Sequence, residues 1–494
     1  MSKTIRILCL FLALLMVASV FVACGDNGGE TTDTNNGTNT NTEAATDPVD
    51  SALNELRAEV DWGGNDFGIL YVNEFGYTEE VEAEPESNDQ TSSAVINDAV
   101  FERNTLFEEY CNLNFVLVPT PNSAAGSAIM AEVQTSTGDF HLITTTADSA
   151  AANATSGYLY NYLDLDIDYE QEWWDAGTLE FALDGRVFFM DGSFNIVDDD
   201  VTFVFMFNKE LRTEYKVANP YDTVKAGDWT LNYFNSVVSQ LATENGDGKW
   251  DENDTYGFST PGSIGNTFFY GAGLKYVENS RDMDAPELVL DKKMEQALNV
   301  LDIARSILQE NNSTYVAAHG SEAVSKEVFI QGRSLFYCEA ASYLRGLNAT
   351  MEREYGVVPV PKYDKAQENY TTWRHGIGST LSIPTSVAKG DMEQFALVLE
   401  TYAVLSQKYV RPAYYDTMLT TRNVQDVESS EMLDLIFLNR TYDMAMYFTQ
   451  LGFNGLFEQA ALSSGNTFAS SYQSNSKRFD KQIANILRKL QSGR

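Results

Sequence analysis

The stretch Asp66-Phe-Gly-Ile-Leu-Tyr-Val72 decides the fold class, because it is a short apolar run of the kind that forms a buried strand. Apolar residues at helical spacing follow it from Ile96 to Tyr110, and a second strand is predicted at 114–119. A further helix around 129–133 and a third strand at 140–146 continue the pattern. Strands that alternate with helices predict an α/β lobe with a mainly parallel sheet.

A second lobe is predicted from the rest of the chain, because 494 residues are too many for one hydrophobic core. Strands are expected at 186–190, 201–207 and 334–338, and helices at 291–308 and 392–405. The hydrophobic content of 44% and the aromatic content of 12% are those of a globular protein.

The N-terminus has the features of an export signal. A positively charged start precedes an apolar run from Ile7 to Ala23, and the sequence turns polar directly after Cys24. Phe21-Val-Ala-Cys24 resembles the bacterial lipobox, which implies that residues 1–23 are a signal peptide and that Cys24 carries lipid. Residues 24–60 are then expected to be a disordered, lipid-anchored tether. A retained transmembrane anchor is the alternative, since the apolar run is at the short end of the spanning range.

Charge and motifs exclude several classes of function. A formal charge of −38 repels phosphate backbones, so nucleic acid is not expected as a partner. The sequence contains no HExxH, GxxxxGK[ST] or GxSxG motif, so zinc, nucleotide and serine-hydrolase chemistry have no support. Paired carboxylates of a glycosidase carry little weight, because 71 acidic residues produce such pairs by chance.

Several segments, taken in order, resemble extracellular solute-binding proteins of ABC transporters, of the sugar-binding (family 1) kind. They are Phe207-Asn-Lys-Glu-Leu211, Gly227-Asp-Trp-Thr230, Asp254-Thr-Tyr-Gly257, Phe329-Ile-Gln-Gly332, Tyr355-Gly-Val-Val-Pro-Val-Pro-Lys362 and Gly378-Ser-Thr-Leu-Ser-Ile-Pro384. Segments 411–416, 428–434 and 439–443 look like a branch of lipoproteins from anaerobic Gram-positive bacteria.

The resemblance implies a two-lobed, periplasmic-binding-protein-like (type II) α/β fold with a ligand cleft between the lobes. Lobe 1 is expected at 61–165 plus about 378–440, and lobe 2 at 166–377 plus about 441–494. The implied function is capture of a carbohydrate, an oligosaccharide, and its delivery to an ABC permease. The expected protein is a monomer without catalytic residues or cofactor, lipid-anchored at the extracellular face of the cell membrane.

Ligand residues are carried over from the resemblance and from the aromatic content. Aromatic faces pack against the C–H faces of sugars, while carboxylates and amides bind hydroxyls. The polar candidates follow predicted strands, and the aromatic candidates lie at an expected crossing or in loops; the set is Asn73, Glu74, Asp148, Trp173, Trp174, Trp373 and Tyr414. Each of them can instead be a structural residue of the core.

Two other classes of function remain open, because a fold by itself does not determine function. The protein could be a secreted glycoside-active enzyme. It could also be a surface sensor or adhesion module that uses the same fold without transport.

The acidic loop 244–258 is a candidate for a structural Ca²⁺ site. Aligned on an EF-hand-type loop with Gly248 at the turn, the ligand positions fall on Asn245, Asp247, Lys249 (through its carbonyl), Asp251 and Asp254. Thr243 occupies the first position, where Asp is usual, so the match is partial. The alternative is a turn rich in Asx and Gly residues that leaves a helix.

Overall fold

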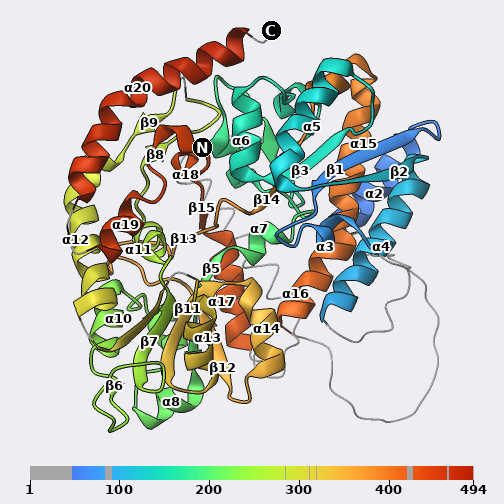
Figure 1. Ribbon diagram of the computed structural model, residues 1–494. Helices are drawn as coiled ribbons and strands as arrows, with labels where there is room; N and C mark the ends of the chain where they lie inside the picture. The colour runs from blue at the N-terminus through green and yellow to red at the C-terminus, as the bar shows by residue number, and fades with distance from the viewer. Residues whose placement is uncertain are drawn as a thin grey trace, which may run out of the picture. The chain divides into compact units, whose positions relative to one another are not determined.

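The computed structural model describes residues 47–83, 92–283, 285–310, 312–318, 320–419, 427–463, 465 and 467–492. The predicted signal peptide and Cys24 lie outside these residues, as does most of the predicted tether. The described residues belong to one compact unit, Asp47–Arg494, whose elements are labelled in Figure 1. The unit contains two lobes, each built on its own sheet.

The first lobe has a five-stranded sheet with the order β2-β1-β3-β14-β4. β1 pairs in parallel with β2 and β3, while β14 runs antiparallel to β3 and β4. The strands are β1 Asp66–Val72, β2 Asn114–Thr120, β3 Leu142–Thr146, β4 Phe189–Met190 and β14 Ser379–Ser382. The predicted α/β class and the predicted first strand are confirmed.

Helices cover both faces of this sheet, which explains why β1 is apolar along its length. Phe67, Ile69 and Tyr71 pack among α2, α4 and α15, whereas Leu70 packs among α5 and α6 on the opposite face. The helices are α2 Pro48–Glu59, α3 Thr78–Val81, α4 Ser92–Cys111, α5 Asn122–Thr135, α6 Ala147–Thr155 and α15 Met392–Leu405.

The second lobe has a sheet with the order β10-β7-β11-β5-β12, and β6 pairs with β7 beside this path. β10, β7 and β11 are parallel to one another, while β5 is antiparallel to β11 and to β12. The strands are β5 Phe203–Asn208, β6 Ala242–Thr243, β7 Thr255–Pro261, β10 Thr314–Ala317, β11 Ser334–Ala340 and β12 Tyr355–Val358.

Helices also cover both faces of the second sheet. Val204 and Met206 of β5 face one helical layer, and Phe205 and Phe207 face the other. The first layer comprises α13 Glu322–Ile330, α14 Ser342–Thr350, α16 Arg411–Leu419 and α17 Val427–Leu438. The second comprises α10 Leu231–Val238, α11 Gly265–Gly271, α12 Met294–Arg305 and α19 Leu456–Leu462. The short α8 Lys209–Glu214 and α9 Pro220–Lys225 follow β5, and β8 Val277–Glu278 pairs with β9 Glu287–Leu288.

The observed lobe boundaries correct those expected from the sequence. Residues 189–190 were expected in lobe 2, but as β4 they pair with β14 in the first sheet. Residues 411–438 were expected in lobe 1, but α17 packs on β12 of the second sheet, while α16 contacts both α4 of the first lobe and α14 of the second. Strand pairing and burial decide this membership, so the chain crosses between the sheets after β4, before β14 and after α15.

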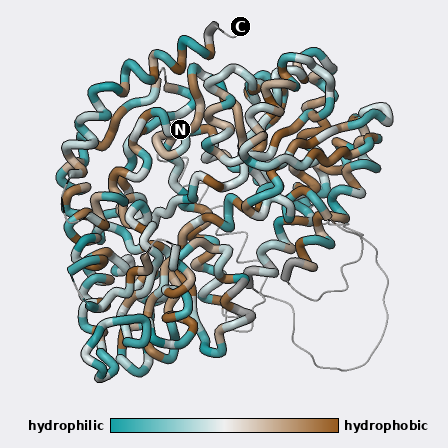
Figure 2. Tube along the Cα trace, in the orientation of Figure 1, coloured by the Kyte–Doolittle hydropathy of each residue, from teal (hydrophilic) through white to brown (hydrophobic). Residues whose placement is uncertain are grey.

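The C-terminal helix α20, Phe468–Ser492, contacts both lobes, whereas residues 441–494 were expected in lobe 2 alone. Its Phe468 packs near Phe457 of α19, and its far end contacts the first lobe, where Leu490 accepts from Arg186. In Figure 1, α20 runs from beside α12 towards α6, and apolar and polar residues alternate along it in Figure 2. α18, Met444–Tyr447, also contacts α6.

The expected tether is wrong for residues 48–59, because they form α2. Asp47 caps the helix by accepting a hydrogen bond from the Val49 amide at 2.8 Å, and Pro48 occupies the first turn, where its missing N–H costs nothing. Val49 and Leu53 are buried in the first-lobe core with residues of α15. The folded body therefore begins before residue 61.

Candidate functional site

The carboxyl ends of β1 and β3 lie side by side, because the two strands are parallel neighbours. The β1–α3 loop, residues 73–77, starts at this edge, and its Asn73 amide donates to the Thr120 carbonyl at 3.0 Å. The first turn of α6 starts at the same edge, where the Ala147 amide donates to the Gly378 carbonyl at 3.2 Å. Open α/β sheets bind ligands at such edges.

The structure brings the three predicted polar residues to this edge. Asn73, Glu74 and Asp148 are all exposed. Glu74 Oε2 accepts from the Asn122 amide at 3.3 Å, and Asp148 Oδ1 accepts from the Ser149 amide at 2.8 Å. Their remaining carboxylate oxygens can accept hydrogen bonds from a ligand.

The four predicted aromatic residues are buried, with exposed fractions of 5% or less. The Trp173 indole donates to Glu400 at 2.6 Å, and Trp174 packs edge-on against Tyr169 and Phe194. Trp373 stacks on Phe203 with the ring centroids 5.1 Å apart. The Tyr414 hydroxyl donates to Asp200 Oδ1 at 2.9 Å. These rings stabilise the two lobes and the crossing, and none offers a free face to solvent in this structure.

Phe75 is a functional candidate that the sequence analysis missed. It lies between the predicted Glu74 and α3, and its side chain is 45% exposed. Its backbone φ of 60° is in the left-handed region, which bulky residues rarely adopt. The only sequence signal is the following Gly76, whose φ is 90°.

A second-lobe helix approaches this edge from the opposite side. α14 begins directly after β11, and its Arg345 donates to Glu79 of α3 at 2.8 Å. The same guanidinium pairs with Asp200 in the segment that crosses between the lobes. The two sheets therefore present their strand ends towards each other at α3 and α14.

The short helix α7, Val197–Asp200, is the centre of the crossing. Its three consecutive aspartates are buried, and each pairs with an arginine from a different part of the chain. Arg440 donates to Asp198 at 2.9 Å and to Asp199 at 2.6 Å, Arg411 of α16 also pairs with Asp199, and Arg345 pairs with Asp200. Burial of such charges is tolerated because each is paired and hydrogen-bonded.

A buried ion pair between Arg374 and Asp191 joins two crossing segments, with 2.8 Å between the charged atoms and both side chains fully buried. Burial raises the pKa of Asp191, and the Arg374 guanidinium opposes that rise. β13, Thr372–Trp373, precedes Arg374 and pairs in parallel with β15, Arg440–Thr441. The three crossings are tied together by the backbone bridge between Thr202 and Arg374 and by the Arg374–Asp191 and Arg411–Asp199 ion pairs.

Comparisons with known proteins were informative only at the level of structure. No protein-family model matches the sequence, and no curated protein sequence matches it. Among solved structures, the GacH receptor of Streptomyces glaucescens, studied with acarbose, matches with a TM-score of 0.51 and 13% identity over 86% of this chain and 99% of that one. MalE of Bdellovibrio bacteriovorus bound to maltotriose matches with a TM-score of 0.52 and 11% identity over 85% and 100%. UgpB of Mycobacterium tuberculosis with glycerophosphocholine matches with a TM-score of 0.50 and 15% identity over 85% and 99%.

The chain has the two-lobed fold of type II solute-binding proteins. Identities of 11–15% establish the fold and leave the ligand open. In such two-lobed proteins a small movement at the crossings displaces one lobe relative to the other. In this chain the charged residues around α7 lie where the chain passes between the two lobes.

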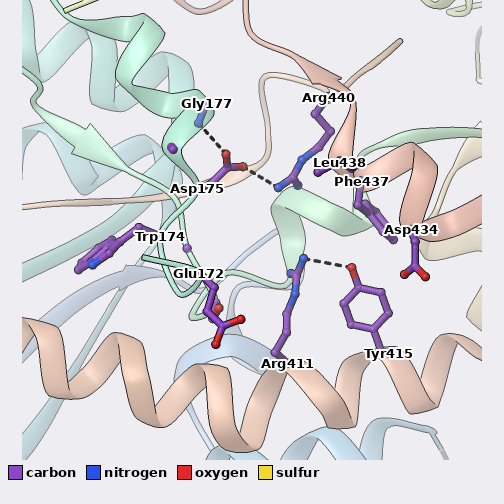
Figure 3. Close-up of a pocket in the computed structure, with 13 residues that line it drawn as sticks. Glu172, Trp174, Asp175, Gly177, Arg411, Tyr415, Asp434, Phe437, Leu438 and Arg440 are labelled. Atoms are coloured by element: carbon purple, nitrogen blue, oxygen red, sulfur yellow. Dashed lines mark hydrogen bonds and ion pairs between the residues drawn. The ribbon is translucent and has the colours of Figure 1, made fainter. Parts of the chain in front are cut away.

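A pocket of about 570 Å³ borders the crossing on the side of β4 and α17. Figure 3 shows Arg440 and Arg411 facing it, with Tyr415, Asp434 and Glu172 around them. Trp174 contributes to its wall, but the indole points away from the arginines. Both guanidinium groups are already paired with Asp198 and Asp199. The pocket thus carries both signs of charge beside the apolar side chains of Phe437 and Leu438.

The loop predicted to bind calcium uses its oxygen atoms to hold its own backbone. Asp254 is buried and accepts from the amides of Asn245 at 2.8 Å and Asp251 at 2.7 Å. Asn245 and Asp247 accept from amides two residues further along, which is the Asx-turn pattern. The observed hydrogen bonds fit the Asx-rich turn, and the calcium site at Asn245, Asp247, Lys249, Asp251 and Asp254 stays a prediction.

Within the described ranges, Asp175, Asp191 and Asp198 are the acidic group compact enough to share an ion, with ligand atoms within 4.8 Å of one another. Arg374 and Arg440 already pair with them. Two guanidinium groups supply the charge that a metal would bring, so this cluster fits an ion-pair network better than a metal site.

None of the helices in the described part of the chain is both long enough and apolar enough to span a membrane. The apolar run 7–23 lies outside that part.

Proposed function

We propose that this protein is the substrate-binding component of an ABC importer and that it captures an oligosaccharide between its lobes. The observation that carries the proposal is that exposed Asn73, Glu74 and Asp148 lie together at the edge where β1 and β3 end. The chain shares its fold with proteins whose structures were solved with acarbose and maltotriose. Amide and carboxylate oxygens are the groups that bind sugar hydroxyls, and Phe75 adds an exposed aromatic ring.

The proposed route of delivery follows from the same fold. The lobes close on the ligand about the crossings, and the closed form docks on a membrane permease. The lipobox-like Phe21-Val-Ala-Cys24 supports a lipid anchor at the extracellular face of the cell membrane. The resemblance of segments 411–416, 428–434 and 439–443 supports the anaerobic Gram-positive lipoprotein branch. A formal charge of −38 is compatible with a soluble body in the aqueous medium outside the cell.

Calorimetric titration of the purified protein with maltotriose, cellotriose, mannotriose and xylotriose tests the proposal. We expect at least one of these sugars to bind saturably, with one ligand per chain, and to be recovered intact by chromatography. Cleavage without saturable binding would instead support a secreted glycoside-active enzyme. If none of the four sugars binds, the carbohydrate assignment fails, and glycerophosphocholine is the next ligand to titrate, because it is bound by UgpB.

A further inference from the structure

Phe75 combines three properties that rarely occur together in one residue. Its ring is 45% exposed, its φ is 60°, and it lies in the β1–α3 loop at the edge described above. Within the described residues, the other non-glycine residues with positive φ are polar; they are Asn112, Ser136, Asp184 and Lys216. A left-handed phenylalanine is strained, and such strain persists where the surrounding structure holds it for a purpose.

Contacts on both sides of Phe75 hold the loop in this conformation. Before it, Glu74 accepts from the Asn122 amide, and after it, the Tyr77 hydroxyl donates to the Ile377 carbonyl. Beneath the loop, a small apolar cluster is formed by Val72, Tyr77, Ala125, Val197 and Val201, with Ile377 packed against it. The backbone therefore cannot relax without disturbing the crossing.

The Phe75 side chain is only partly covered by the protein, with 45% of it exposed. Among the described residues its aromatic neighbour is Tyr77, with centroids 6.0 Å apart and planes tilted by 58°. Full burial of the ring would remove more apolar surface from water, and the fold achieves this only in part. Exposed polar oxygens of Asn73 and Glu74 precede it in the same loop. An exposed ring beside hydrogen-bonding groups matches the two faces of a pyranose.

We propose that Phe75 is the ring-stacking residue of the first lobe, and that it packs against the C–H face of a pyranose whose hydroxyls bind Asn73, Glu74 or Asp148. The inference rests on the proposed carbohydrate function. The backbone of Phe75 has a φ of 60° at the edge where β1 ends, and α14 approaches this edge from the other lobe through the Arg345–Glu79 pair. The strained phenylalanine lowers the stability of the fold relative to a glycine at this position, and its ring raises the affinity for the ligand.

Three substitutions at Phe75 test the inference by combining two measurements. Affinity for the trisaccharide that the wild type binds should fall about tenfold or more in Phe75→Ala and Phe75→Gly, and should stay close to wild type in Phe75→Trp. The melting temperature of Phe75→Gly should exceed that of Phe75→Ala, because glycine adopts positive φ without strain. The difference in melting temperature tests the backbone strain, and the loss of affinity in both variants, restored in Phe75→Trp, tests the stacking role.

Two controls are matched to the positive φ and to the exposed ring of Phe75. Lys216→Gly changes a residue with φ of 57° far from the edge, and Trp250→Ala removes a ring that is 41% exposed in the loop 244–258. Both should bind the trisaccharide as the wild type does. Wild-type affinity in Phe75→Ala and Phe75→Gly would overturn the stacking role while leaving the proposed function intact. Absence of binding by the wild type to all four trisaccharides would overturn both.

Discussion

Glu80 shows how one buried side chain can connect the first lobe to the crossing. Its exposed fraction is 1%, and its Oε1 accepts from the amides of Ile196 and Val197 at 2.6 Å and from the Ser379 hydroxyl at 2.5 Å. Among the described residues, Oε2 has no hydrogen-bond partner. Burial raises the pKa of Glu80 to about 7, against the lowering effect of these three donors. The carboxyl is therefore protonated in the folded protein at pH values where an unfolded glutamate is charged.

Glu80→Gln should remove a pH dependence of stability. The folded protein binds one more proton than the unfolded chain between pH 4.5 and about 7, so the contribution of Glu80 is present at low pH and is lost as the pH rises through 7. The loss in the wild type is on the order of 3 kcal/mol of unfolding free energy, and the amide variant should not show it. Urea unfolding of both proteins from about pH 5 to about pH 8 measures the difference.

Glu132→Gln is the matched control, since Glu132 is also buried but its pKa is lowered. Burial opposes that lowering, and hydrogen bonds from Thr137 and Gly138 outweigh it. Its contribution to stability is present at neutral pH and is lost on acidification, so the control should lose stability at neutral pH. If the free energy of unfolding changed with pH in the same way in both variants, the raised pKa of Glu80 would be contradicted.

At the scale of single residues, the sequence predicted where the polar candidates lie, and it did not predict that the aromatic candidates are buried. Asn73, Glu74 and Asp148 could be found because they directly follow strands whose apolar pattern is local. Trp373 could not be judged, because its stacking partner Phe203 lies far away in the chain. Phe75 could not be found, because exposure and a positive φ are properties of coordinates.

At the scale of elements, α2 changes where the folded body begins. A chain that starts at residue 47 should unfold at the same temperature as one that starts at residue 24. A chain that starts at residue 61 loses the burial of Val49 and Leu53 against α15 and should be less stable by about 3 kcal/mol. Thermal and urea unfolding measure the stability of the three chains. If the chains that start at 47 and 61 were equally stable, the prediction of a tether over the whole of 24–60 would hold after all.

The sequence analysis missed α2 because composition and periodicity gave opposite indications. The region up to residue 50 is rich in Thr, Asn and Gly, which is typical of disorder. Leu53 and Leu56 are spaced for one helical face, and Asp47-Pro48 is a helix-start signal. Helices inside the lobes were easier to predict; for example, a helix was expected at 392–405, and α15 is Met392–Leu405.

At the scale of the whole molecule, the Arg345–Glu79 pair is placed to bias the angle between the lobes. Glu79→Gln removes the contact between α14 and α3 but leaves Arg345 paired with Asp200. We expect a larger radius of gyration in small-angle X-ray scattering of the ligand-free protein. The free energy of unfolding should change by less than about 1 kcal/mol, because Glu79 is 39% exposed.

Glu210→Gln is the control for this measurement, because Glu210 pairs with Arg353 at 2.7 Å within the second lobe. The Glu210→Gln substitution removes an ion pair of similar length and leaves the contact between the lobes unchanged. Identical scattering curves for Glu79→Gln and Glu210→Gln would show that the Arg345 contact does not influence the lobe angle.

The sequence by itself determined the α/β class, the strands β1, β2, β3, β5 and β11 and the positions of the polar residues after β1 and β3, because these follow from patterns within a few residues. Tertiary structure alone decided the lobe boundaries, the burial of Trp173, Trp373 and Tyr414, and the charged crossing at α7. The physical reason is separation along the chain: Arg345 and Glu79 are 266 positions apart, and only folding brings their charges within 2.8 Å.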